Sequence, residues 1–195
     1  MDLFGLEKFD KILSRLAKIQ IDIYPKQCSR NRNRNSSCQK CVEVCPTRVL
    51  SIDFASQIDL LGCTACGLCA TVCPNGVFEL KNPTDQQLLS QIGLCLKENS
   101  ELIFICDKIQ PTSEENSGQS LYLNQAIKVS CLGRLNEAIL VGSAALGASL
   151  IWLNNSQCEN CEVRSGAAVI EEMVRASQQI LEIFKENLRK NLERV

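Results

Sequence analysis

The chain has 195 residues, of which 13 are cysteine and none is histidine. Without histidine, Cys₂His₂ zinc sites, Rieske-type ligation, histidine-ligated haem and histidine-based acid–base catalysis are all excluded. The 21 basic and 22 acidic side chains give a formal net charge of −1, so the chain as a whole has no electrostatic basis for binding nucleic acid or an acidic membrane.

Charge is nevertheless unevenly distributed along the chain. Residues 1–50 carry ten basic and five acidic side chains, whereas residues 51–127 carry three and nine. Two interpretations stay open: an ordinary solvated surface, or a basic docking patch for an acidic redox partner.

Residues 3–19 are predicted to form an amphipathic helix, because apolar residues recur there at spacings of three and four. Such a helix either packs on its own protein or docks onto a partner subunit. The N-terminus lacks the apolar segment of a signal peptide, which predicts a cytoplasmic protein. In that reducing compartment, clustered cysteines bind metal or carry out redox chemistry more often than they form disulfides.

The cysteine-rich segment that follows contains two copies of one motif, 28 residues apart. Each copy has three cysteines at the same relative positions, and a proline follows the last of them. They are Cys38, Cys41 and Cys45 in the first copy and Cys66, Cys69 and Cys73 in the second. The leading cysteines, Cys28 and Cys63, break this offset by seven residues. A polar insertion in the Arg-Asn-rich loop at 29–37 accounts for the difference.

The second copy reads Cys-x₂-Cys-x₂-Cys-x₃-Cys-Pro over residues 63–74. This run resembles that of bacterial two-[4Fe–4S] ferredoxins, and the resemblance covers residues 28–81. It implies an α+β ferredoxin-like module with two [4Fe–4S] clusters, in which the last cysteine of each run ligates the other cluster. The implied ligands are Cys28, Cys38, Cys41 and Cys73 for cluster one, and Cys45, Cys63, Cys66 and Cys69 for cluster two.

Two other ligation schemes are considered for this module. If the long loop keeps Cys28 away, cluster one has three protein thiolates, as in a [3Fe–4S] form. A Cys₄ zinc ribbon also uses Cys-x₂-Cys pairs, but it does not account for the interleaved repeat with two Cys-Pro endings.

Residues 84–195 are predicted to form a small α/β domain, after a lead-in at 1–27 and the ferredoxin domain at 28–83. A helix over 84–99 is followed by buried strands at 101–106, 126–131 and 148–153, with helices near 134–146 and 166–193 and an exposed linker at 108–118. This alternation of strands and helices indicates a parallel sheet. The sixteen-residue apolar run 138–153 is short for a membrane span, so no transmembrane segment is predicted.

Four further cysteines lie at or just after the ends of the predicted strands. They are Cys106, Cys131, Cys158 and Cys161. Because the carboxyl ends of parallel strands share one edge of a sheet, these thiols are expected to meet there and to form a metal site, most simply a third cluster of the [2Fe–2S] type. The alternatives are core cysteines or a redox-active dithiol of Cys158 and Cys161. Cys95 is predicted to be a buried thiol without such a role.

The strand ending in Cys106, the segment around Cys131 and the late Cys158/Cys161 pair resemble the iron–sulfur delta subunit of methyl-viologen-reducing hydrogenases. The resemblance implies electron delivery to heterodisulfide-reductase-type complexes. This chain departs from the family in its closer terminal cysteine pair and in its lack of histidine.

The sequence contains no Gly-rich nucleotide loop, histidine-based triad or phosphate-binding lysine motif, so no active site of its own is predicted. The prediction is an iron–sulfur electron-transfer protein that relays single electrons between redox partners, as a cytoplasmic subunit of an anaerobic oxidoreductase complex. Two alternatives are a cluster-fed dithiol reductase that uses Cys158 and Cys161, and an iron–sulfur cluster scaffold.

Overall fold

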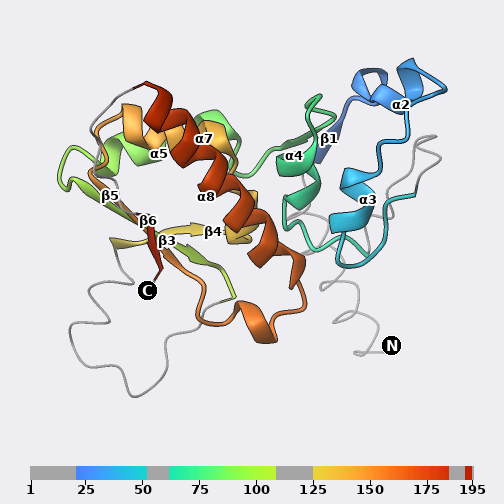
Figure 1. The fold of residues 1–195 in the computed structure, drawn as a ribbon. Coiled ribbons are helices and arrows are strands. Elements are labelled where there is room, and N and C mark those ends of the chain that lie inside the picture. Colours follow the sequence, from blue (N-terminus) through green and yellow to red (C-terminus); the bar gives the residue numbers. More distant parts are fainter. Residues whose placement is uncertain (1–20, 52–61, 109–124, 185–191, 195) are drawn as a thin grey trace, which may run out of the picture. The chain divides into compact units, whose positions relative to one another are not determined.

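The computed structural model describes residues 21–51, 62–108, 125–184 and 192–194, and the chain divides into two compact units, Met1–Thr84 and Asp85–Val195 (Figure 1). The predicted N-terminal helix at 3–19 and most of the predicted linker at 108–118 lie outside the described residues. Within the described part of the chain, no helix is both long and apolar enough to cross a membrane.

The first unit is closed by a two-stranded antiparallel sheet. Strand β1 (Ile21–Ile23) pairs with β2 (Phe78–Leu80), which brings together the two ends of the cysteine-rich segment. Among the described residues between these strands are four short helices: the 3₁₀ helix η1 (Pro25–Gln27), α2 (Ser29–Arg32), α3 (Lys40–Val44) and α4 (Leu68–Val72).

The two copies of the sequence motif fold alike. Helix α3 ends at Cys45 and helix α4 ends at Cys73, both in extended backbone, and α3 packs against α4. A proline follows each of these cysteines, and proline disfavours the helical conformation in the residue before it. Each Cys-Pro pair therefore ends its helix and turns the chain out of it.

Cysteines make up much of the interior of this unit. The buried residues Cys28, Leu50, Val77 and Phe78 form the core, and Cys41, Cys45, Cys69 and Cys73 are among the partly buried side chains packed against them. Ile21, Ile23 and Val42 pack against the same core, so thiols and aliphatic side chains together fill the described interior of this unit.

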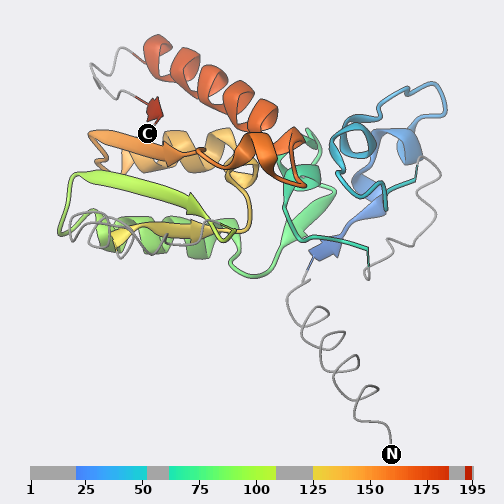
Figure 2. The ribbon, with the colours of Figure 1, turned by 90° about the horizontal axis from the view of Figure 1, so that it is seen from below.

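The second unit contains the expected parallel sheet. Its strands lie in the order β4 (Ile127–Val129), β3 (Glu101–Cys106), β5 (Leu150–Asn154) and β6 (Leu192–Arg194), and all pairings are parallel. The view in Figure 2 shows the strands side by side with helices behind them. Strand β3 has the predicted bounds, whereas β4 is shorter than the predicted strand at 126–131.

Three helices pack in a row on one side of this sheet (Figure 1): α5 (Asp85–Cys95), α7 (Glu137–Ala145) and α8 (Ser165–Ile183). Two 3₁₀ helices, η2 (Leu132–Arg134) and η3 (Cys158–Asn160), follow strands β4 and β5. Buried aliphatic and aromatic residues fill the interior, including Leu102, Phe104, Ile127, Ile139 and Ile151.

An ion pair between a buried arginine and a half-exposed aspartate joins η2 to the start of α5. Arg134 is 2% exposed, and its guanidinium donates to Asp85 Oδ1 at 3.1 Å. Asn136 Nδ2 donates to Asp85 Oδ2 at 2.8 Å, and its own Oδ1 caps α7 by accepting from Ile139 N at 2.9 Å. These contacts fix η2, and with it the segment that follows Cys131.

Candidate iron–sulfur sites

The first unit brings Cys28, Cys38, Cys41 and Cys73 to one small cavity of about 20 Å³. Cys28 directly precedes α2, and Cys41 lies within α3. Cys73 comes from the second copy of the motif, at the end of α4. The cavity therefore contains the complete set of residues that the sequence assigned to cluster one, including Cys28 beyond its nine-residue loop.

A second cavity of similar size is lined by Cys45, Cys63, Cys66 and Cys69. Three of these cysteines belong to the segment that leads into and begins α4, and Cys45 comes from the end of α3. The two sets are thus interleaved, with one cysteine exchanged between the copies.

Backbone amides donate to the sulfurs at both cavities. Ala65 N lies 3.4 Å from Cys63 Sγ, and Val77 N lies 3.4 Å from Cys73 Sγ. At Cys45, the sulfur and Thr47 Oγ1 are 3.8 Å apart. Donors of this kind stabilise thiolates and are among the factors that set the reduction potential of an iron–sulfur cluster.

Burial makes these thiols hard to ionise. It raises the pKa of Cys41 to about 11, with a further contribution from the neighbouring Cys73. The pKa of Cys69 is raised still further, first by burial and then by the charges of Cys66, Cys63 and Cys45. Several thiolates at one buried point need a nearby positive charge, which bound iron would supply.

In the described part of the chain, no group of three or more Cys, Asp or Glu side chains is arranged to hold a single metal ion. A [4Fe–4S] cluster does not need such a group, because each of its four thiolates binds a different iron and sulfide ions bridge the irons.

Residues 36–77 match the model of the 4Fe-4S dicluster domain family. This segment is a dicluster ferredoxin domain. Cys28 lies just before the matched residues, so its assignment as a ligand depends on the geometry of the first cavity. The predicted ferredoxin domain is confirmed, while the number of clusters and their individual ligands belong to the proposal below.

A second comparison concerns a curated protein. Over 45 residues the chain is 40% identical to one subunit of the ion-translocating oxidoreductase complex of Methanosarcina acetivorans. The match covers 23% of this chain and 17% of that protein, so the similarity is confined to one segment of each. No solved structure matches the chain.

The second unit has a cavity of its own, of about 530 Å³, which is lined by Cys106, Cys158 and Cys161. Cys106 ends β3, and the other two cysteines lie in and directly after η3, which follows β5. The cavity thus lies at the carboxyl ends of parallel strands, where the sequence predicts a metal site. Cys131 is 7% exposed and is not among the lining residues.

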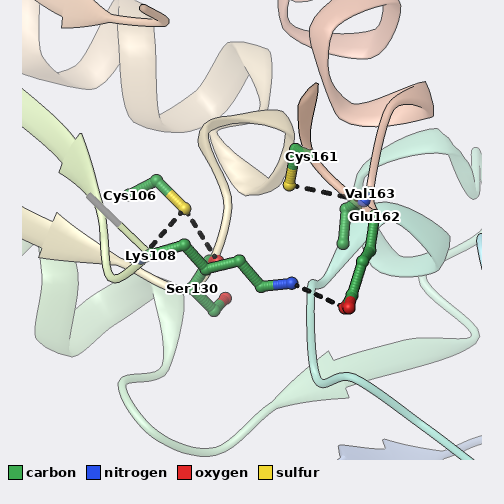
Figure 3. A network of polar contacts seen from close by, with 6 residues as sticks. All are labelled: Cys106, Lys108, Ser130, Cys161, Glu162 and Val163. Atoms are coloured by element: carbon green, nitrogen blue, oxygen red, sulfur yellow. Dashed lines mark hydrogen bonds and ion pairs between the residues drawn. The ribbon is translucent and has the colours of Figure 1, made fainter. Parts of the chain in front are cut away.

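Polar groups contact two of the thiols of this cavity, those of Cys106 and Cys161 (Figure 3). Lys108 N lies 3.5 Å from Cys106 Sγ, which in turn lies 3.4 Å from the carbonyl oxygen of Ser130. Val163 N donates to Cys161 Sγ at 3.4 Å. Burial raises the pKa of Cys106 and of Cys158; the neighbouring Cys161 adds to both shifts, and Cys106 also adds to that of Cys158.

Sequence reasoning missed one pair at this cavity. Lys108 Nζ and Glu162 Oε2 form an ion pair at 3.2 Å beside the thiols (Figure 3). The sequence places Lys108 in an exposed linker and indicates no role for Glu162. The one available signal is that each closely follows a candidate cysteine, Cys106 or Cys161.

Proposed function

We propose that the protein is an electron carrier with two [4Fe–4S] clusters. Cys28, Cys38, Cys41 and Cys73 hold cluster one, and Cys45, Cys63, Cys66 and Cys69 hold cluster two. The observation that carries the proposal is that each set surrounds one cavity, with a cysteine exchanged between the two copies of the motif. A Cys₄ zinc ribbon does not account for this exchange of cysteines between the two copies.

When bound, such clusters take up and release one electron at a time. The chain itself supplies the thiolates, the amide donors to Cys63 and Cys73, and apolar cover from Leu68 and Phe78. Apolar cover and amide donors are both factors that tune the potential of a cluster. Catalysis would then take place in a partner protein.

The protein is proposed to work as a subunit of a multisubunit oxidoreductase. The similarity of one segment to a subunit of an ion-translocating oxidoreductase complex supports this assignment. The resemblance of the second unit to the delta subunit of methyl-viologen-reducing hydrogenases points in the same direction.

For the second unit, the proposal is a third iron–sulfur cluster at the edge of the sheet. Cys106, Cys158 and Cys161 line the cavity there, and the delta-subunit resemblance adds Cys131 as the fourth ligand. The rival is a dithiol reductase in which Cys158 and Cys161 act on a small substrate. The cavity volume of about 530 Å³ favours the rival, because it leaves room for a substrate beside the thiols.

The first experiment is anaerobic purification, followed by iron and acid-labile sulfide counts and by electron paramagnetic resonance of the reduced protein. The expected result for the ferredoxin domain is about eight irons with interacting [4Fe–4S] signals. A count of about ten or more supports the third cluster. Zinc without sulfide would contradict the main proposal.

Serine substitutions then separate the two interpretations of the second unit. If the third cluster exists, Cys158→Ser combined with Cys161→Ser removes its iron and leaves about eight per chain. Unchanged iron with loss of a reactive dithiol supports the reductase. Cys95→Ser is the matched control, because Cys95 lines none of the three cavities. Cys131→Ser tests whether the buried fourth cysteine is a ligand.

A further inference from the structure

The segment 26–40 carries a concentrated positive charge, and we name it the basic loop. Its five cationic side chains are Lys26, Arg30, Arg32, Arg34 and Lys40. No acidic residue occurs anywhere from residue 23 to residue 42. Four of the five cations are exposed, and Arg30 is half-buried. The basic loop includes the insertion that distinguishes the first copy of the cysteine motif from the second.

Asparagine and serine residues hold this loop in a defined conformation. Asn31 Nδ2 donates to the carbonyl oxygen of Pro25 at 2.8 Å, and Asn33 Oδ1 accepts from Asn35 N at 2.9 Å. The hydroxyl oxygens of Ser36 and Ser29 lie 3.1 Å apart and link two parts of the loop. In the alternating Arg-Asn sequence, the asparagines thus form the local frame, and the arginines are presented on it.

The cations of the basic loop have no acidic partner in the described part of the chain. None of the ion pairs found there involves any of the five. Lys81 of the same unit is different, since it pairs with Asp22 at 2.6 Å and with Glu79 at 3.7 Å. Positive charge that no acidic side chain of the described residues neutralises is available to a binding partner.

The basic loop is also part of the cluster-one cavity. Ser29 and Lys40 line it together with Cys28, Cys38 and Cys41. A partner that binds the basic loop therefore comes close to cluster one, and proximity of this kind is what electron transfer between proteins requires.

We propose that the basic loop is the docking surface for an acidic electron-carrier protein, which exchanges single electrons with the protein at cluster one. In each exchange the reduced partner loses one electron and this protein gains one, and no bond forms or breaks. This inference rests on the proposed function. A nucleic-acid partner is less favoured, because the basic loop has no aromatic side chain on which a base could stack.

The test uses the full-length, cluster-loaded protein and an acidic flavodoxin as the probe. The variant carries Arg30→Gln, Arg32→Gln and Arg34→Gln. The matched control carries Lys97→Gln, Lys128→Gln and Arg175→Gln, which removes the same charge from exposed positions of the second unit. Iron content and the electron paramagnetic resonance spectrum verify that both proteins retain their clusters. A lack of iron in the unsubstituted protein would contradict the proposed function itself.

Stopped-flow reduction by flavodoxin hydroquinone at low ionic strength is expected to slow at least about tenfold in the loop variant and to lose most of its salt dependence. Calorimetric binding of oxidised flavodoxin should weaken in parallel, while the control variant resembles the unsubstituted protein. Reduction by the methyl viologen radical cation should not slow, because repulsion of that probe decreases.

Three results would overturn the inference. The first is an unchanged rate and salt dependence in the loop variant. The second is an equal loss in both variants, which would show an effect of net charge alone. The third is binding of a mixed-sequence RNA at physiological salt that the loop variant abolishes while flavodoxin reduction is unaffected.

Discussion

The two units use cysteine in opposite ways. In the ferredoxin unit, cysteines are part of the core, and Cys28 is buried beside Leu50, Val77 and Phe78. In the sheet unit, aliphatic and aromatic residues such as Phe104 and Ile139 fill the interior, and the cavity cysteines lie at the edge of the sheet. Thiols therefore contribute to the interior of the first unit, whereas in the second they lie at the edge of a sheet whose interior is filled by other side chains.

The cavities of the two units also differ, both in volume and in lining. Those of the ferredoxin unit are about 20 Å³ each and are lined mainly by cysteines and apolar side chains, with Ser29 and Lys40 at the cluster-one cavity. The cavity of the sheet unit is about 530 Å³ and is lined by polar residues, including Asn154, Gln157 and Asn160. Small sites suit a permanently bound group, and a large polar one suits exchange with the surroundings. Four experiments test this difference between the two units.

The largest expected effect is that of metal removal. Oxidation followed by chelation should unfold the ferredoxin unit and leave the sheet unit folded, because the binding free energy of a structural metal site contributes directly to folding. Limited proteolysis with mass spectrometry should then show cleavage throughout residues 21–84 and protection of the β3 and β5 strands. Equal protection of both units after complete loss of iron would contradict the comparison.

Truncation of the core of the sheet unit should give the converse result. Phe104 is fully buried on the central strand β3, so Phe104→Ala should lower the free energy of unfolding of that unit by about 3–5 kcal/mol. Chemical denaturation followed by tryptophan fluorescence measures this, since Trp152 lies on the neighbouring strand β5.

Iron content is the control for Phe104→Ala. The ferredoxin domain of this variant should hold as much iron as that of the unsubstituted protein. Phe78→Ala in the ferredoxin unit should have the opposite profile, with faster cluster loss, because Phe78 lines the cluster-one cavity. If both substitutions affected iron retention equally, the two units would not be energetically distinct.

Breaking one ion pair in each unit should have a smaller effect on stability. Asp85→Ala removes the carboxylate that pairs with the buried Arg134 and should lower the free energy of unfolding by about 3 kcal/mol. This value is at the lower end of the range for a broken buried pair, because the Asp85 side chain is 48% exposed. Lys81→Ala breaks an exposed pair in the ferredoxin unit and should cost much less, because water and salt screen its charges. Thermal denaturation of both variants makes the comparison, and similar losses would show that burial is not the deciding factor.

The sequence predicted the elements whose signals are local. The β3 strand and the α5 and α7 helices follow from apolar runs and a capping box, whereas the two interleaved cysteine sets were implied by the resemblance to two-cluster ferredoxins. The antiparallel pairing of Ile21 with Leu80 was not predicted, because three-residue strands so far apart in the chain carry almost no periodicity.

The site in the sheet unit was predicted less completely, for a physical reason. The rule that strand ends share an edge brings Cys106 to Cys158 and Cys161, but it does not say which way a side chain points. Cys131 follows a strand that ends early, at Val129, and it directly precedes η2 as a buried residue. Its burial depends on tertiary packing around Arg134, which the spacing of cysteines does not encode.

The last experiment concerns two glycines with left-handed backbone. Gly76, at φ +62°, follows Cys73 in the ferredoxin unit, and Gly147, at φ +111°, follows helix α7 in the sheet unit. Alanine at either position should cost about 1–2 kcal/mol, because a Cβ atom is strained in this conformation even where space is available. Gly76→Ala should therefore speed cluster loss to a chelator by roughly five- to thirtyfold if that strain is released on opening.

The matched variant should behave differently in the same two assays. Gly147→Ala should lower the stability of the sheet unit while leaving the rate of cluster loss unchanged. Gly76→Asn should lie between the unsubstituted protein and Gly76→Ala, because asparagine tolerates the left-handed region better than alanine does. A change in cluster loss caused by Gly147→Ala would mean that the sheet unit contributes to holding the clusters, and the division between a metal-dependent and a self-sufficient unit would then fail.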